Sequence, residues 1–87
     1  MAMTRDYSPA MLRFFLQARA FLRADLAGVP IRKARGQIAG ETARVARVKR
    51  RQVEAAMSGR SVPAGEHARI WRALGHDVAE DGGPSNG

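Results

Sequence analysis

Apolar side chains recur at helical spacing between Ser8 and Gly28. A serine followed by proline is a typical helix start, because serine caps the free amides and proline fits the first turn. A glycine favours a helix end. The pattern therefore predicts a helix over residues 9–26. The apolar positions expected to face the core are Met11, Phe14, Phe15, Ala18, Phe21 and Leu22.

This predicted apolar face is broad, and it has two interpretations. It is either entirely core, or part of it, Phe15 and Leu22, forms a contact between two copies of the chain. The polar positions expected on the opposite side of the same helix are Arg13, Gln17, Arg19, Arg23 and Asp25.

The next segment starts at Pro30 and predicts a short helix over residues 31–35, which Gly36 interrupts. Residues 39–57 then divide into two helices with a tight turn at Arg47 and Val48. Small residues share one face of the first helix, where the two backbones would cross: Ala39, Ala43 and Ala46. The second helix, over residues 49–57, has an inward face made of Val53 with Ala56 or Met57.

A last helix is predicted from Pro63 to Leu74, between exits at Gly59 and Gly75. Its apolar side consists of Ala68, Ile70, Trp71 and Leu74, and we expect Trp71 in the core rather than stacked on a base. The sequence thus predicts an all-α, compact bundle of four to five helices. It forms one domain over residues 8–77, between a flexible N-terminus, 1–7, and a disordered tail, 78–87.

The distribution of charged residues adds a prediction about the binding partner. The net charge is +7, and eight lysines or arginines lie between Arg32 and Arg51, against a single acid, Glu41. Such clustering is typical of a polyanion partner, although a solvated basic face is the plain alternative. A membrane surface fits less well, because the segment lacks the bulky apolar face of an interfacial helix.

A helix pair whose second member has a basic first turn is the layout of a helix-turn-helix, here at residues 39–57. With Val53 inward, Arg51 and Ala55 point outward and Gln52 lies on the flank. We expect Arg51 to read guanine, Gln52 adenine and Ala55 a thymine methyl group. The residues expected to hold phosphates are Arg44, Lys49, Arg50, Arg32, Lys33 and Arg35. For Arg32, Lys33 and Arg35, a merely solvated position is an equal alternative.

The stretch from residue 39 to 75 resembles the Cro and phage-repressor superfamily. The residues that carry the resemblance are Ala43, Val48, Val53, the Ser58-Gly59-Arg60 exit, Pro63 and residues 69–75. Arg47 stands where the family favours glycine. The resemblance implies a sequence-specific regulator that binds double-stranded DNA, similar to a small repressor. It would repress by occupying its operator, and activation by contact with polymerase is the open alternative. Because one copy reads only a few base pairs, we expect a homodimer on a two-fold site.

The sequence contains few features that would support another function. There is no cysteine, and the two histidines have no further ligands at metal-binding spacing, so we expect no metal, no cofactor, no small-molecule substrate and no enzyme activity. The lack of a membrane-spanning run or signal peptide predicts no membrane partner and a cytoplasmic location. The alternative is a protein-binding module, such as an antitoxin or antiactivator. Val45 near the binding face and the broad apolar face favour it, whereas the charge favours DNA.

Overall fold

The first helix begins and ends where the sequence predicts. In the computed structural model, which describes residues 7–78, α1 spans Pro9–Ala27. The Ser8 hydroxyl accepts a hydrogen bond from the Met11 amide at 3.2 Å, which satisfies one free donor of the first turn. Gly28 ends the helix with a φ of 66°, a left-handed conformation that glycine adopts without strain.

α2 is one continuous helix, Ile31–Ala46. The predicted short helix over residues 31–35, with an interruption at Gly36, is therefore wrong. A glycine inside a helix costs only about 0.8–1.0 kcal/mol relative to alanine. Ile38, which is buried, alone stabilises the helix by about 1.5–3 kcal/mol, and Ala34 is buried beside it. Tertiary packing on both sides of Gly36 thus outweighs its low helix propensity.

A short turn joins α2 to α3, which spans Arg50–Met57. The predicted turn at Arg47 and Val48 is confirmed. Arg47 has a φ of 59° and a ψ of 45°, and it is the single non-glycine residue with a positive φ within residues 7–78. The turn therefore contains one backbone conformation that ordinary residues adopt only at a cost.

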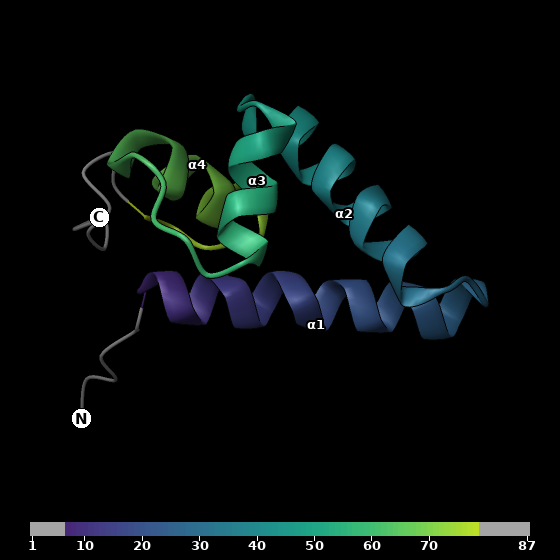
Figure 1. Ribbon diagram of the computed structural model, residues 1–87. Helices are drawn as coiled ribbons and strands as arrows, with labels where there is room; N and C mark the ends of the chain where they lie inside the picture. Colours follow the sequence, from purple (N-terminus) through teal and green to yellow (C-terminus); the bar gives the residue numbers. More distant parts are fainter. Residues whose placement is uncertain (1–6, 79–87) are drawn as a thin grey trace.

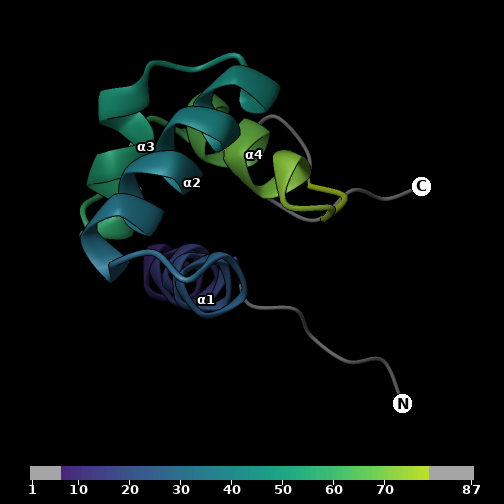
Figure 2. The same cartoon turned by 90° about the vertical axis from the view of Figure 1, so that its right-hand side faces the viewer.

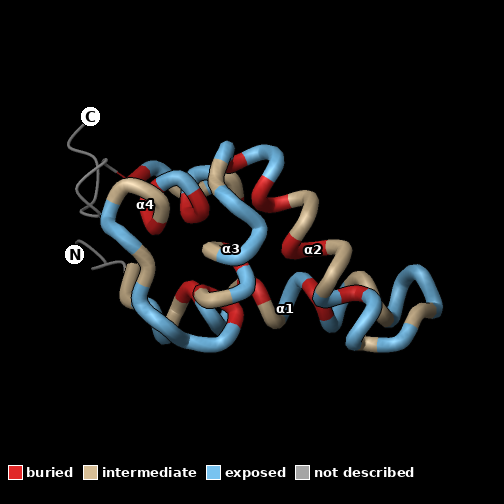
Figure 3. The backbone as a smooth tube through the Cα atoms, turned by 45° about the horizontal axis from the view of Figure 1, so that its top comes forward, coloured by how far each residue is buried: buried red, intermediate tan, exposed pale blue. Residues whose placement is uncertain are grey.

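The four helices of residues 7–78 form a bundle in which α1 lies along one side and the others pack over it (Figure 1). α4 spans Ala64–Ala73, and α3 stands across α1 (Figures 1 and 2). Buried residues lie where the helices face one another (Figure 3). The predicted all-α class is confirmed. The core consists of Leu12, Leu16, Ala20, Ile38, Ala39, Ala43, Ala46, Val53, Ala56, Met57, Ala68, Ile70, Trp71, Leu74 and Val78.

α1 faces this core with a different side from the one predicted. Its buried residues, spaced four apart, are Leu12, Leu16 and Ala20. The residues predicted to face inward that are exposed instead are Phe14, Ala18, Phe21 and Leu22. Only Met11 and Phe15 of the predicted set pack against the core, and both remain partly accessible. The stripe of two phenylalanines therefore points away from the bundle.

The arginines of α1, predicted to lie on the solvent side, reach towards the other helices. Arg19 Nη2 donates to the backbone oxygen of Leu74 at 3.3 Å. The side chain of Arg13 lies against Gly59, where its Cδ would be 3.2 Å from an added Cβ. Arginine contributes here through its long apolar stem and its donors, so α1 has polar flanks and an apolar outward side.

Tyr7 and the last helix close the end of the core. The Trp71 ring lies edge-to-face with Tyr7, Phe15 and His76, at centroid distances of 5.0, 5.4 and 4.9 Å. His67, which is buried, has Nε2 2.6 Å from the Tyr7 carbonyl oxygen, so this nitrogen must carry a proton. A protonated Nε2 leaves no lone pair for Trp71 Nε1, 3.0 Å away, which donates instead to the Tyr7 oxygen at 3.3 Å.

The two chain ends were predicted to be flexible over residues 1–7 and disordered over residues 78–87. Residues 1–6 and 79–87 lie outside the described part of the chain. At the borders, Tyr7 packs on Trp71, and Val78 is buried. The packed region thus extends one residue beyond the predicted domain at each end.

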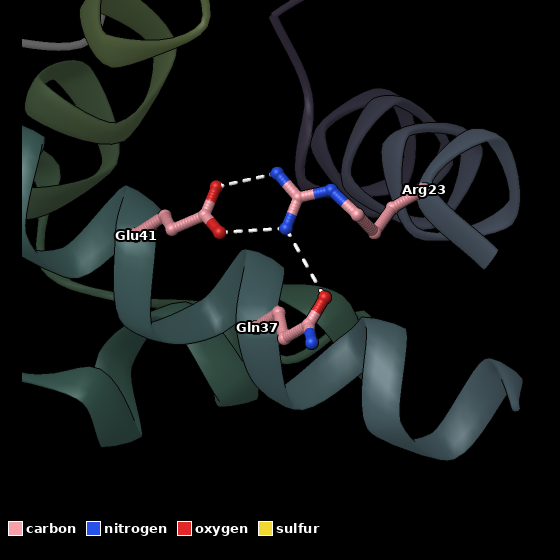
Figure 4. Close-up of polar contacts among 3 residues, drawn as sticks. All are labelled: Arg23, Gln37 and Glu41. Atoms are coloured by element: carbon pink, nitrogen blue, oxygen red, sulfur yellow. Dashed lines mark hydrogen bonds and ion pairs between the residues drawn. The ribbon is translucent and has the colours of Figure 1, made fainter. Parts of the chain in front are cut away.

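One ion pair connects α1 to α2 (Figure 4). Arg23 donates to both carboxylate oxygens of Glu41, at 2.6 and 2.7 Å, and to Gln37 Oε1 at 3.2 Å. Hydrogen bonds from Arg23 hold the pKa of Glu41 below its ordinary value; partial burial opposes this, and the charges of Arg23 and Arg44 add to it. The same hydrogen bonds raise the pKa of Arg23.

Glu41→Gln should lower the melting temperature at neutral pH by a small amount. Because the pKa of Glu41 is depressed in the folded state, its contribution is present above the ordinary glutamate pKa of about 4.3 and disappears as the pH falls through the folded-state value. Thermal melts from pH 7 to pH 3 should show the two proteins converging in acid. In an Arg23→Gln background, the same substitution should have almost no effect at pH 7; a full effect there would contradict the pairing.

Candidate nucleic-acid interface

The start of α3 is an exposed basic segment of the bundle. Lys49 is the N-cap residue, with an extended backbone, and Arg51 follows in the first turn. Both are exposed, and neither side chain makes a hydrogen bond or ion pair with any described residue, although the Lys49 backbone oxygen accepts from the Gln52 amide at 2.9 Å. Val53 on the opposite side is fully buried, so a helical rotation of about 200° sends Arg51 away from the core.

The other two predicted base-reading residues flank Arg51. Ala55 lies one turn further along the same side of α3 and is partly exposed. Gln52 is also partly exposed, on the edge of the helix. The exposed side of α3 therefore carries the small Ala55 next to Arg51, which would let the major groove of a nucleic acid approach the helix closely.

Arg50 lies in a different direction, across the face of α2. Its Nε is 3.2 Å from Glu54 Oε2, one turn along α3. Its guanidinium lies over the backbone of α2, where Nη2 would be 3.1 Å from a Cβ added to Gly36 and Nη1 would be 3.8 Å from one added to Gly40. The two glycines leave the space that this side chain occupies, which explains a role for glycine in the middle of a helix.

The predicted phosphate-holding residues divide into two groups around Arg50. Lys33 and Arg44 line one shallow groove with Gly36, Gly40 and Arg50. Arg32 and Arg35 line a second groove, which runs between α1, α2 and α3 and shares Arg50. The structure thus brings five of the six predicted phosphate-holding residues to two grooves that share Arg50, and Lys49, which precedes Arg50 in the sequence, lines neither groove.

Arg13 is a member of this region that the sequence did not identify. It lines the second groove from α1, with Arg32, Arg35 and Arg50. No spacing rule finds it, because it lies on another helix and its helical pattern placed it on a solvent side. Only the packing of α1 against α3 brings it there.

A second basic surface was also missed. Arg47, Arg69 and Arg72 line a hollow between the end of α2 and α4, together with Val45. Val45 is 66% exposed, as the sequence indicated. The Arg72 side chain is held in one orientation, because its Nε donates to the Val78 oxygen at 2.7 Å. This surface is separate from the first, since it shares none of its residues.

Comparison of the chain with protein-family models, curated proteins and solved structures gives no match. Within residues 7–78, no three metal-ligating side chains gather as a metal site would require. None of the helices in that part of the chain has the length and hydrophobicity needed to cross a bilayer.

Proposed function

We propose that the chain is a sequence-specific regulator of transcription that binds double-stranded DNA through α2 and α3. The observation that carries the proposal is that the side chains of Lys49 and Arg51, at the start of α3, are exposed and have no partner among the described residues. In the sequence they follow α2, whose basic residues line two grooves that share Arg50. A helix whose N-terminal residues are exposed and basic suits the major groove, and a preceding helix that crosses the backbone suits the phosphates.

In this arrangement α3 enters the major groove. Arg51, Gln52 and Ala55 contact base edges. Arg51 is the principal reader of the three, because it is long, exposed and directed away from the core, whereas Gln52 and Ala55 are only partly exposed. Lys49 and Arg50 hold phosphates at the edge of the groove. Arg44, Arg32, Lys33 and Arg35 hold the backbone along α2, whose first turn carries no acid to repel it.

A single α3 reads only a few base pairs, so we infer that the protein acts as a homodimer on a two-fold site. Acting in the cytoplasm, it would repress by occupying an operator. Seven surplus positive charges on 87 residues also favour fast, charge-steered association with DNA.

The rival function is a protein-binding module. Its support is the exposure of Val45 and of the outward side of α1. DNA selection separates the two: genomic fragments retained by the purified protein should share a short sequence if the proposal is right. Retention of no fragment above background would favour the protein-binding module.

The salt dependence of binding provides a quantitative test. Six phosphate contacts predict that log K falls with log salt at a slope of roughly −5, so that affinity drops about 10³-fold between 50 and 200 mM salt. Arg44→Ala should make the slope shallower by about one unit. Arg69→Ala is the matched control, because Arg69 belongs to the separate surface between α2 and α4. A slope near zero for the parent would refute DNA binding.

A further inference from the structure

The side of α1 that points away from the bundle is an apolar surface in a strongly basic protein. We call it the outward face and define it by Phe14, Ala18, Phe21, Leu22 and Asp25, all of which are exposed. At 100° per residue, its centre lies opposite the buried stripe of α1. Phe14, Phe21 and Leu22 are 62, 59 and 58% exposed. A contiguous patch of this kind marks an interaction surface.

The outward face also lacks positive charge. The arginines of α1 turn towards the body of the protein: Arg23 pairs with Glu41, and Arg19 donates to the oxygen of Leu74. Arg13 lies against Gly59. Asp25 is thus the single charged residue of the face. Two molecules that each carry +7 can therefore approach one another here without bringing cations together.

We propose that the outward face binds the same face of a second copy, as an antiparallel pair of α1 helices around a two-fold axis near Ala18. A two-fold contact needs a self-complementary surface. Here the small Ala18 lies between Phe14 on one side and Phe21 with Leu22 on the other, so rotation places each large side chain opposite a large one. Asp25 comes beside the partner's helix start, whose first turn carries no acid and whose dipole favours an anion.

The arrangement of the helices suits this pairing. Figures 1 and 2 show α3 standing across α1 and displaced towards one edge of the bundle. A two-fold axis perpendicular to α1 keeps both α3 helices at the same edge. Two copies bound to successive major grooves on one side of DNA need their α3 helices at a common edge, with half-sites about 34–36 Å apart. This step rests on the proposed function, because DNA supplies the required spacing.

The contact is small, and this sets the expected affinity. One helix pair covers less than the roughly 800 Å² per partner of a standard interface. The dimer should therefore be weak in solution and form more readily on DNA, where two half-sites hold both copies together.

Sedimentation velocity of the full chain, from micromolar to millimolar concentration and without DNA, tests the dimer directly. The parent should pass from monomer to dimer. Phe21→Lys should raise the dimer dissociation constant at least about 10-fold, because it buries a charge at the centre of the pair. Leu26→Lys is the matched control: Leu26 is 76% exposed on the same helix but about 100° from the outward direction. Circular dichroism should show both variants folded as the parent is.

A parent that stays monomeric at every concentration, or equal effects of the two substitutions, would overturn the proposal. So would growth into larger assemblies, which means a generally adhesive surface rather than a two-fold contact. Binding to DNA with one half-site tests the proposed function separately and should be the same for the parent and Phe21→Lys. If the parent forms the dimer but does not bind DNA with one half-site, the proposed DNA binding is refuted, whereas the proposed dimer surface stands. On two half-sites one turn apart, Phe21→Lys should abolish cooperative binding.

Discussion

Replacement of Trp71 by alanine should lower the free energy of unfolding by about 3–5 kcal/mol. Trp71 is completely buried, and its ring contacts Tyr7, Phe15 and His76. Truncation removes this apolar surface, leaves a cavity and frees the Tyr7 oxygen from one of its donors. A small domain has a total stability of only about 5–15 kcal/mol, so the variant should be close to unfolded at physiological temperature.

Urea unfolding followed by circular dichroism measures this change. The control is Leu26→Ala, also a large-to-small substitution but at an exposed position of α1, which should alter stability by less than about 0.5 kcal/mol. If Trp71→Ala and Leu26→Ala unfold at the same urea concentration as the parent, the packing of α4 on Tyr7 and α1 is wrong.

Arg51→Ala should reduce affinity for the selected DNA site by about 1–3 kcal/mol, which is about 5- to 150-fold, and should relax preference at one or two base pairs. The reason is position: Arg51 is exposed on the side of α3 opposite Val53, with no partner in the described residues. Binding to scrambled DNA should change much less.

Lys49→Ala is the matched variant for this test. It removes a neighbouring, equally unpaired cation at the helix start, where we expect a phosphate contact. It should weaken binding to every sequence by a similar factor and make the salt slope shallower by about one unit. If Arg51→Ala also weakens both DNAs alike, Arg51 holds a phosphate, and base reading must lie with Gln52 or elsewhere.

Most helix ends were predictable because each has a local chemical cause. Ser8 and Pro9 start α1, and Gly28 and Gly59 provide left-handed exits. Gly36 led to a wrong prediction, an interruption of the helix. Its low helix propensity is local, whereas the burial that holds α2 straight depends on helices that are distant in sequence.

The orientation of α1 was not predictable for a different reason. The helix has apolar side chains on two sides, and hydrophobic spacing does not say which side meets the rest of the chain. The large rings of Phe14 and Phe21 outweighed Leu16 and Ala20 in the pattern, yet the latter are buried. An apolar stripe on a helix predicts that this side is buried, but it does not say whether the same chain or another molecule covers it.

The candidate site was predicted in part. Residues on α2 and α3 are close in sequence, so helical periodicity placed Arg44, Lys49 and Arg51 near one another. Arg13 required the tertiary packing of α1, and the direction of Arg50 required the space above Gly36.

A side chain at Gly36 would have two opposing effects. An alanine there would favour the helix by about 0.5–1 kcal/mol. Its Cβ, however, would lie 3.1 Å from Arg50 Nη2, so the guanidinium would have to shift by a few tenths of an ångström. Gly36→Ala would therefore gain helix stability and displace the end of one cationic side chain, so this position couples the stability of α2 to the placement of Arg50.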